Sequence, residues 1–432
     1  MPCAWRPAQL ASYGRSDWLG QRGHIDLPRT AAPFGGDGAG NRTLTAGAIG
    51  GVCQHRTVDT PVRAEVVVDL DAIRHNVRLL ADLAAGAATM IVVKADGYGH
   101  GAIPVARAAV QAGASWLGAS SLDEALALRD AGLTVPILAW LDLLDADRTA
   151  GVTADIDLSA SSRDELDAVR VAAGRAGRRA RVHLKIDTGM TRNGCQPAEW
   201  PALVAEAARA QREGAVEIVA VWSHLACADE PTDKSVDEQA EQFDLAYRQA
   251  VDAGLTPIRH LANAAAVLTR PDLHFDLVRP GIACYGLNPV PVDADLRPAM
   301  TFRSAVVATK RVPAGESVGY GRTWTAPVDT TLALVPVGYA DGVPRALSGR
   351  FEVWLAGRRR PAVGRVSMDQ VVIDCGDEEI PPGAEVVLFG PGVDGQPTAR
   401  EWADIVGTID YEIVTGMYRP RVTRRYVGEQ SR

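Results

Sequence analysis

The sequence contains no apolar run near the ~20 residues that a helix needs to span a bilayer. It also lacks an excess of positive charge, since 45 Lys and Arg face 53 Asp and Glu and the net charge is −8. This balance argues against a nucleic-acid partner and against binding to an anionic membrane surface. The apolar fraction of 47% and the charged fraction of 23% are those of an ordinary globular protein. A chain of 432 residues is long enough for two domains.

The cysteines form no CxxC pair. Scattered thiols in a long chain fit a reducing cytoplasm better than a disulfide framework, so we expect a cytoplasmic protein. Each thiol is interpreted as a small buried hydrophobe rather than a reactive group. The six residues are Cys3, Cys53, Cys195, Cys227, Cys284 and Cys375.

Residues 1–63 differ from the rest of the chain. They are rich in Gly, Arg, Thr and Pro and show no sustained hydrophobic period. No continuous apolar segment follows the early arginines, which argues against a secretory signal. A transit peptide and a start site placed too early remain alternatives. We predict a disordered extension and exclude it from the fold.

Residues 64–289 alternate short strand-like runs with amphipathic helical patterns. The run EVVVDLD, for example, precedes a stretch whose apolar residues share one helical face. Two capping boxes, at 121–124 and 162–165, mark helix starts. About eight or nine such alternations fit a (β/α)8 barrel of the TIM type, with a doubly wound sheet as the alternative.

Residues 290–432 have a different texture. Alternating apolar and polar stretches are separated by turn sequences such as VPAGE and IPPGAE, and helical periodicity is nearly absent before 400–405. The sequence therefore predicts an α/β protein in which the barrel is followed by a mostly antiparallel β domain. The run 358–360, Arg-Arg-Arg, is interpreted as a solvated hairpin loop.

Several polar residues directly follow strand-like runs, where a barrel builds its active site. Lys94 follows the run 90–93 and precedes a glycine-rich turn that includes Tyr98. His224 and Arg279 end two further strand candidates. Taken alone, each could be an ordinary solvated or structural residue. Together with the strand that carries Lys185 and Asp187, they make four such strand ends, which are harder to dismiss, and the backbone at Gly281 and Ile282 could present N–H groups to an anion.

The run RVHLKID predicts an inward-facing lysine. Its apolar residues alternate with His183, Lys185 and Asp187, so Lys185 and Asp187 should turn toward the barrel interior. An inward lysine is costly unless it is neutralised or paired, and a salt bridge to Asp187 or another acid competes with a functional role. The loop that follows could bring Arg192 over the barrel mouth.

Three tyrosine- and methionine-bearing segments of the β domain remain open at this point. VGYADGVPR contains Tyr339, GRVSMDQ contains Met368 and Asp369, and IDYEIV contains Tyr411. A half-buried packing residue is the ordinary interpretation of each tyrosine.

Eight segments occur together in the order seen in alanine racemases, and the chain resembles this family over roughly 64–426. The first of them is similar to the family's pyridoxal-phosphate attachment signature. The segments are VVKADGYGHG, HLKIDTGMTRNG, WSHLACADE, HLANAA, VRPGIACYGL, VGYADGVPR, GRVSMDQ and IDYEIV.

The resemblance implies interconversion of L- and D-alanine by two bases acting on a pyridoxal 5'-phosphate aldimine, with no metal. Lys94 would bind the cofactor and act as one base. Tyr339 would be the opposing base, contributed by the β domain of the other subunit, so that a homodimer shares its active sites. The implied role is to supply D-alanine for peptidoglycan.

The resemblance also assigns roles to other residues. His224 and Arg279 would form a network with the catalytic tyrosine, and Arg279 would face the pyridine nitrogen. Lys185 would be carbamylated and would pair as an anion with Arg192, which lies near the cofactor's phenolic oxygen and the substrate. The residues near the cofactor phosphate would be Tyr98, Asn263, Ala264, Gly281, Ile282 and Tyr411. Those near the substrate carboxylate would be Met368 and Asp369.

Two positions depart from the family pattern. Ala264 stands where a serine is common, and the missing hydrogen bond, worth ~1.5–3 kcal/mol gross, predicts weaker cofactor retention. Trp222 stands where tyrosine is frequent and receives no interpretation. A serine or broad-specificity racemase, a non-catalytic pyridoxal-phosphate carrier and a basic amino-acid decarboxylase remain alternatives.

Overall fold

The computed structural model describes residues 62–428. Almost all of the predicted extension 1–63 therefore lies outside the described residues. Within 62–428, no helix is long and apolar enough to cross a membrane.

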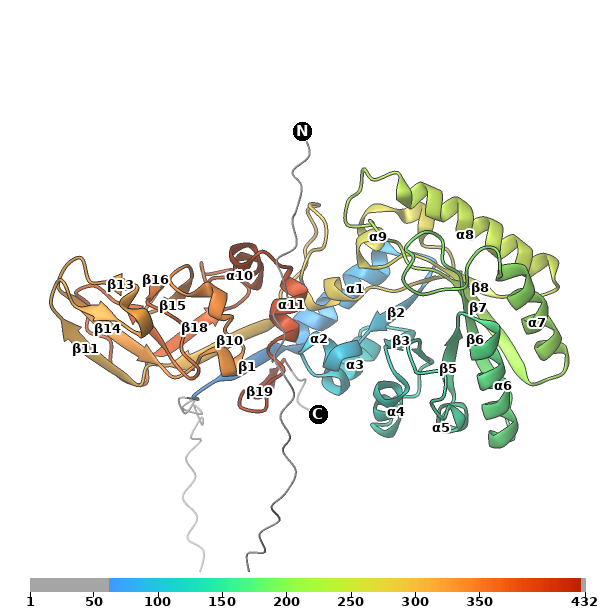
Figure 1. Cartoon of the computed structure of the whole chain (residues 1–432), viewed down its shortest axis with the longest axis horizontal. Helices are drawn as coiled ribbons and strands as arrows, with labels where there is room; N and C mark the ends of the chain where they lie inside the picture. The colour runs from blue at the N-terminus through green and yellow to red at the C-terminus, as the bar shows by residue number, and fades with distance from the viewer. Residues whose placement is uncertain (1–61, 429–432) are drawn as a thin grey trace, which may run out of the picture. The chain divides into compact units, whose positions relative to one another are not determined.

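The first large unit is a nearly closed barrel of eight parallel strands in the order β8-β7-β6-β5-β4-β3-β2-β9 (Figure 1). The barrel nearly closes between β9 and β8. Strand β9 pairs with β2, and just after β9 the Arg279 N donates to Ala262 O, just after β8, at 2.9 Å. This confirms the predicted barrel. The strands are β2 (Ala88–Val92), β3 (Trp116–Ala119), β4 (Ile137–Ala139), β5 (Ile156–Ala160), β6 (Ala180–Lys185), β7 (Val216–Trp222), β8 (Ile258–His260) and β9 (Leu277–Val278).

Helices connect the barrel strands, and both predicted capping residues begin one. Ser121 Oγ accepts from Glu124 N, and Ser162 Oγ accepts from Glu165 N. The helices are α1 (Leu70–Leu83), α2 (Lys94–Tyr98), α3 (Ala102–Gln111), α4 (Leu122–Asp130), α5 (Thr149–Thr153), α6 (Arg163–Ala176), α7 (Trp200–Arg212), α8 (Ser235–Asp252), α9 (Ala264–Thr269) and the 3₁₀ turns η1 (Pro271–Leu273) and η2 (Ile282–Tyr285).

The second unit is a sheet of nine strands in the order β11-β14-β17-β16-β15-β18-β10-β1-β19. Its strand pairs are antiparallel except β1–β19. The strands are β1 (Glu65–Asp69), β10 (Met300–Ala305), β11 (Ala308–Val312), β14 (Thr330–Val335), β15 (Glu352–Leu355), β16 (Arg358–Val363), β17 (Val371–Asp374), β18 (Glu385–Phe389) and β19 (Thr423–Val427).

Smaller elements complete the β domain. The hairpin β12 (Ser317–Val318) and β13 (Trp324–Thr325) forms a separate pair. Two helices, α10 (Ala399–Val406) and α11 (Asp410–Thr415), precede β19. The remaining 3₁₀ turns are η3 (Tyr320–Arg322), η4 (Tyr339–Asp341) and η5 (Arg345–Leu347).

The N-terminal boundary of the barrel at residue 64 is wrong. Strand β1, predicted as part of the barrel, pairs with β10 and β19 in the β-domain sheet. Arg63, assigned to the extension, contacts the same domain through Asp341 at 2.7 Å. An apolar run predicts a strand but not its neighbours, which are set by contacts with residues more than 200 positions away.

The prediction of a solvated loop at 358–360 is also wrong. These residues begin β16, and Arg360 is only 2% exposed. Its guanidinium donates to Leu355 O and Cys375 O and pairs with Glu378, so its polar groups are satisfied inside the domain.

Candidate active site

A cavity of about 570 Å³ opens at the carboxyl ends of the barrel strands. This is where a barrel gathers residues from several strands into one site. Eleven of the predicted site residues line it: Lys94, Tyr98, Lys185, Arg192, His224, Asn263, Ala264, Arg279, Gly281, Ile282 and Tyr411.

Lys94 stands at the end of β2 and begins the short helix α2. Burial, and secondarily the charge of Arg192, lower the pKa of its ammonium group, while Glu124 opposes the shift. Glu124 also accepts a hydrogen bond from Ala95 N at 2.7 Å, so it anchors the backbone next to the lysine. The neutral, nucleophilic form of Lys94 is therefore more accessible than that of a free lysine.

The turn after Lys94 is left-handed over several residues. Ala95, Asp96 and Tyr98 have φ near 50°, a conformation that costs non-glycine residues roughly 1–2 kcal/mol each. The Asp96 carboxylate stabilises the turn, because it accepts from Ala102 N at 2.9 Å and pairs with Arg424 of β19 at 2.7 Å. The β domain therefore helps to fix the loop that presents Lys94.

Tyr98, Gly281 and Tyr411 meet at one side of the cavity. A Cβ at Gly281 would lie 2.5 Å from Tyr98 Oη, so only glycine permits this approach. The rings of Tyr98 and Tyr411 lie 6.3 Å apart, and burial raises the pKa of both hydroxyls. The two phenols therefore remain protonated hydrogen-bond donors at neutral pH.

Arg279 forms the polar floor and is 4% exposed. Its guanidinium donates to Ser223 O at 2.8 Å, Leu261 O at 3.1 Å and His260 Nδ1 at 3.0 Å, and its Nη2 also lies 3.3 Å from His224 Nδ1. Burial lowers its pKa to about 9, which leaves it a cation at neutral pH. No carboxylate contacts it among residues 62–428.

His224 lies beside this cation and is neutral. Burial, followed by the charges of Arg279 and Lys185, lowers its pKa well below the usual value. Because Arg279 can only donate, the 3.3 Å contact between its Nη2 and His224 Nδ1 favours the tautomer with the His224 proton on Nε2.

Lys185 faces the barrel interior, as the alternation in β6 predicted. It is 5% exposed, and its Nζ lies 4.3 Å from the ring centroid of Trp222. The competing salt bridge is absent from the described part of the chain, since Asp187 instead accepts from Gly189 N and Thr191 N. Burial and the charges of Arg279 and Arg192 lower the pKa of Lys185 to about 8.

Asn263 and Ala264 lie where β8 leads into α9. Asn263 Oδ1 accepts from Ala266 N at 3.1 Å and caps that helix, while the Ala264 side chain is a methyl group that offers the cavity no hydrogen-bond donor. The carboxamide oxygen of Asn263 is thus engaged in holding the turn.

Three predicted residues, Tyr339, Met368 and Asp369, do not line this cavity. They form a platform on the β domain, where Tyr339 N donates to Ser367 O and Ala340 N to Met368 O. Tyr339 is 39% exposed and Met368 is 52% exposed. Below them, buried Asp341 accepts from Gly338 N at 3.0 Å. The structure thus brings the barrel residues together and presents the platform residues on a surface.

Several residues in or below the cavity had no predicted role. Trp222, left without interpretation, stacks on His260 at 5.4 Å and also lies 5.0 Å from the Arg279 guanidinium. His260 was part of a matched segment, HLANAA, but received no role. His183 was seen only as an inward-facing position, and Asp157 carried no local signal.

Two family models match the chain: "Alanine racemase, N-terminal domain" over residues 68–289 and "Alanine racemase, C-terminal domain" over residues 299–426. The chain is 55% identical to the alanine racemase of Salinispora arenicola over 370 residues, which cover 85% of this chain and 99% of that protein.

Solved structures give the same result. The alanine racemase of D-cycloserine-producing Streptomyces lavendulae has a TM-score of 0.84 and 48% identity, with 86% of this chain and 99% of that chain covered. An alanine racemase of Bartonella henselae "with covalently bound pyridoxal phosphate" has a TM-score of 0.77 and 30% identity, covering 85% of this chain and 100% of that one. The chain therefore belongs to the alanine racemases, a family of amino-acid isomerases.

Proposed function

We propose that this chain interconverts L- and D-alanine by a two-base mechanism on pyridoxal 5'-phosphate held by Lys94, and so supplies D-alanine for peptidoglycan. One observation carries the proposal: Lys94, whose pKa is lowered, and Arg279, which no carboxylate of the described residues contacts, line the same cavity of an alanine racemase fold. A cytoplasmic location fits the four free cysteines of the described residues.

The residues that are present fit this cofactor. Lys94 offers an amine for its aldehyde. Because Gly281 has no side chain, its backbone can lie close to the Tyr98 hydroxyl. We assign Tyr98, Tyr411, Gly281 and Ile282 to the phosphate, together with Asn263 and Ala264. Arg279 would face the pyridine nitrogen, as a donor without a neighbouring carboxylate.

When bound, the cofactor supplies an electron sink that acidifies the substrate's α-proton. The Lys94 amine would take or return that proton on one face. Tyr339 of the partner subunit would do so on the other, because one base cannot easily reach both faces of a planar centre. His224, as a neutral Nε2–H donor, would orient that tyrosine through its remaining ring nitrogen.

Arg279 determines how much negative charge the ring can retain. A guanidinium orients its hydrogen bonds but does not readily give up a proton. A weak proton donor at this place would disfavour transamination when the cofactor is bound. Exchange of Arg279 for Glu should therefore increase pyruvate formation from alanine.

Lys185 is proposed to carry a carbamate. Its amine has a pKa of about 8, so a useful fraction is neutral near physiological pH and can add carbon dioxide with release of one proton. The resulting anion would lie between Arg192 and Arg279, the two cations whose charges act on this lysine. That pairing replaces repulsion among the exposed Arg192 and the buried Lys185 and Arg279 by attraction.

The platform residues are proposed to act in the partner's site. Tyr339 and Met368 are exposed in the single chain, although their backbone is fixed by hydrogen bonds. A homodimer would give them a cavity to complete, with Met368 and Asp369 near the substrate carboxylate. Activity should therefore fall when the protein is diluted below its dimer dissociation constant.

The decisive experiment compares wild type with Lys94→Ala. We expect the wild type to show absorbance of bound cofactor and to convert L-alanine into D-alanine, and the variant to lose both. Bound cofactor without D-alanine formation in the wild type would contradict the proposal and favour a carrier or a decarboxylase. L-Serine as a parallel substrate measures specificity.

A further inference from the structure

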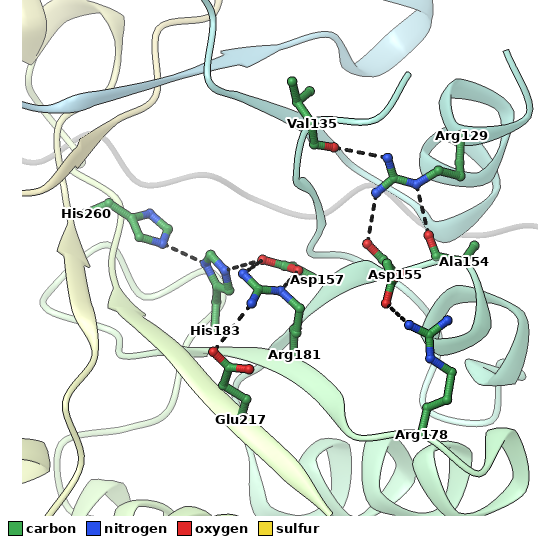
Figure 2. Close-up of polar contacts among 10 residues, drawn as sticks. All are labelled: Arg129, Val135, Ala154, Asp155, Asp157, Arg178, Arg181, His183, Glu217 and His260. Carbon is green, nitrogen blue, oxygen red and sulfur yellow. Dashed lines mark hydrogen bonds and ion pairs between the residues drawn. The ribbon is translucent and has the colours of Figure 1, made fainter. Parts of the chain in front are cut away.

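A line of buried polar side chains crosses the barrel interior beneath the cavity, and Figure 2 shows its deeper part. Arg279 Nη1 lies 3.0 Å from His260 Nδ1, His260 Nε2 lies 2.9 Å from His183 Nδ1, and His183 Nε2 lies 3.0 Å from Asp157 Oδ2. The two histidines and Asp157 have 0% exposure. The line therefore connects three strands to the cavity floor without reaching solvent.

The chemistry of its two ends fixes every proton in this line. A guanidinium only donates, and a carboxylate only accepts. His260 must accept at Nδ1 and donate from Nε2, and His183 must do the same. An imidazolium at either position would carry an extra proton on Nδ1. In His260 that N–H would face the N–H of Arg279, and in His183 it would face the Nε2–H of His260, so two donors would oppose each other. Both histidines are therefore neutral Nε2–H tautomers, and all three hydrogen bonds run from Arg279 to Asp157.

Charge is separated along this line. At its far end, Arg181 Nε donates to Asp157 Oδ1 at 2.7 Å and neutralises the carboxylate (Figure 2). At the near end, the direct acceptors of Arg279 are carbonyl oxygens and neutral imidazoles. The carboxylate thus orders the hydrogen bonds from two histidines away.

Packing prevents the imidazoles from turning over. Trp222, the strand partner of His260, stacks on it at 5.4 Å with an interplanar angle of 15°. Trp116 packs its edge against His183 at 5.4 Å. These contacts and the hydrogen bonds on both nitrogens of each ring together favour the orientation observed, so the direction of the hydrogen bonds follows from the folded barrel.

We infer that Asp157, His183 and His260 are positioning residues, which form a one-directional hydrogen-bond chain that orients Arg279 and leaves its positive charge undiminished at the cavity. What Arg279 faces rests on the proposed function, whereas the order of the protons rests on the contacts of this chain alone. The cost of burying these groups is offset because every ring nitrogen in the line has a partner.

The first test reads the tautomers directly in the holoenzyme. Long-range ¹H–¹⁵N spectra of protein labelled in histidine distinguish Nδ1–H, Nε2–H and imidazolium rings, and His183→Gln and His260→Gln assign the signals. We expect Nε2–H with an accepting Nδ1 at both positions. An Nδ1–H tautomer or an imidazolium at either position overturns the inference.

The second test breaks the line at two distances from Arg279. His260→Leu removes the acceptor and should lower kcat ~10–100-fold, the range seen when the group that orients a site residue is lost, with KM for alanine changed less than about threefold. His260→Gln, which offers an oxygen to Arg279 and an amide N–H to His183, should recover most of the rate. Asp157→Asn keeps the side-chain volume but replaces one carboxylate oxygen by an amide N–H donor. It should therefore alter the tautomers of the two histidines and raise the ratio of pyruvate to D-alanine.

Arg129→Met is the matched control. Arg129 donates to Val135 O, Ala154 O and Asp155 O, just before β4 and β5 and therefore near the end of the barrel where Asp157 lies. It does not contact Asp157, His183 or His260 (Figure 2). Its loss should lower Tm and leave the tautomers and kcat unchanged. The positioning role would be excluded if Arg129→Met changed the tautomers and kcat as much as Asp157→Asn does. It would also be excluded if Asp157→Asn changed neither the tautomers nor the ratio of pyruvate to D-alanine. A wild type without racemase activity refutes the proposed function, while the spectra still decide the proton order.

Discussion

The barrel and the β domain contribute to the candidate site in different ways. Lys185 and Arg279 of the barrel are 5% and 4% exposed and are surrounded by groups of the same chain. Tyr339 and Met368 of the β domain are 39% and 52% exposed, outside the cavity. The barrel residues are thus preorganised within one cavity, whereas the platform residues lie on a surface of the β domain.

The platform nevertheless has a defined backbone. Gly338 admits no side chain, since a Cβ there would lie 2.2 Å from Ser367 O. Arg421 pairs with Asp369 at 2.5 Å and lies 3.6 Å from buried Asp341. Exposure here reflects position rather than disorder, which is what a surface that docks on a partner requires.

The largest expected effect concerns the platform tyrosine. Tyr339→Phe should lower kcat about 10²–10⁴-fold, because it removes a general base while keeping the ring. Tyr320→Phe, at a tyrosine 72% exposed on the same domain, is the control and should leave kcat unchanged.

Mixed dimers test whether Tyr339 acts across the subunits. Co-expressed Lys94→Ala and Tyr339→Phe chains should recover roughly a quarter of wild-type activity, because half of randomly formed dimers are mixed and each has one intact site of two. Inactive mixed dimers would show that the tyrosine serves its own chain.

The next largest effect concerns the support beneath the platform. Asp341→Ala should cost ~1–3 kcal/mol of folding stability, because it leaves the buried Gly338 N without its acceptor and removes the partner of the partly exposed Arg63. Denaturant unfolding measures this. The pair of Arg311 with Asp377, whose side chain is 89% exposed, is the comparison, and Asp377→Asn should cost less than about 1 kcal/mol. Equal costs would mean that the platform is not supported by Asp341.

A smaller effect is expected inside the barrel at Lys185. ¹³C-labelled bicarbonate should produce a carbamate signal that grows as the pH rises through about 8, because only the neutral amine reacts and protonation prevents it below that pH. Lys185→Gln should abolish the signal and raise KM roughly tenfold through the lost charged contact with Arg192. A signal that survives in Lys185→Gln would assign the carbamate to another lysine.

The smallest effect concerns cofactor retention. Ala264→Ser should lower the Kd for pyridoxal phosphate about three- to tenfold, since it adds one donor to a charged acceptor. Ala264→Val adds bulk without a donor and should not tighten binding. Fluorescence titration of the cofactor-free protein distinguishes the two, and equal Kd values for Ser and Ala would remove this position from the phosphate site.

Much of the barrel could be predicted from local patterns. The period-two alternation around Lys185 placed that side chain inside, and the capping serines located two helix starts. These features depend on residues within four or five positions of each other, so periodicity reveals them. The placement of Lys94 after β2 follows from the same local rule.

Other features depend on contacts that no local pattern records. Strand β1 looks like its barrel neighbours but pairs with β10 and β19. Asp157 and His260 are about 100 positions apart, and they share a role only because β5 and β8 both face the barrel interior. Ala95 and Asp96 adopt a left-handed turn that a glycine would tolerate more easily, and contacts from α4 and β19 stabilise it.

By itself, the sequence determined the family, the two-domain order and the identity of the groups that reach the cavity, because motif order and strand-end position are properties of the chain. The tertiary structure decided the sheet to which β1 belongs, the directed line from Arg279 to Asp157 and the exposure of Tyr339. The reason is physical: a proton's position in a buried hydrogen-bond chain is set by donors and acceptors that only the closed barrel brings within 3.0 Å.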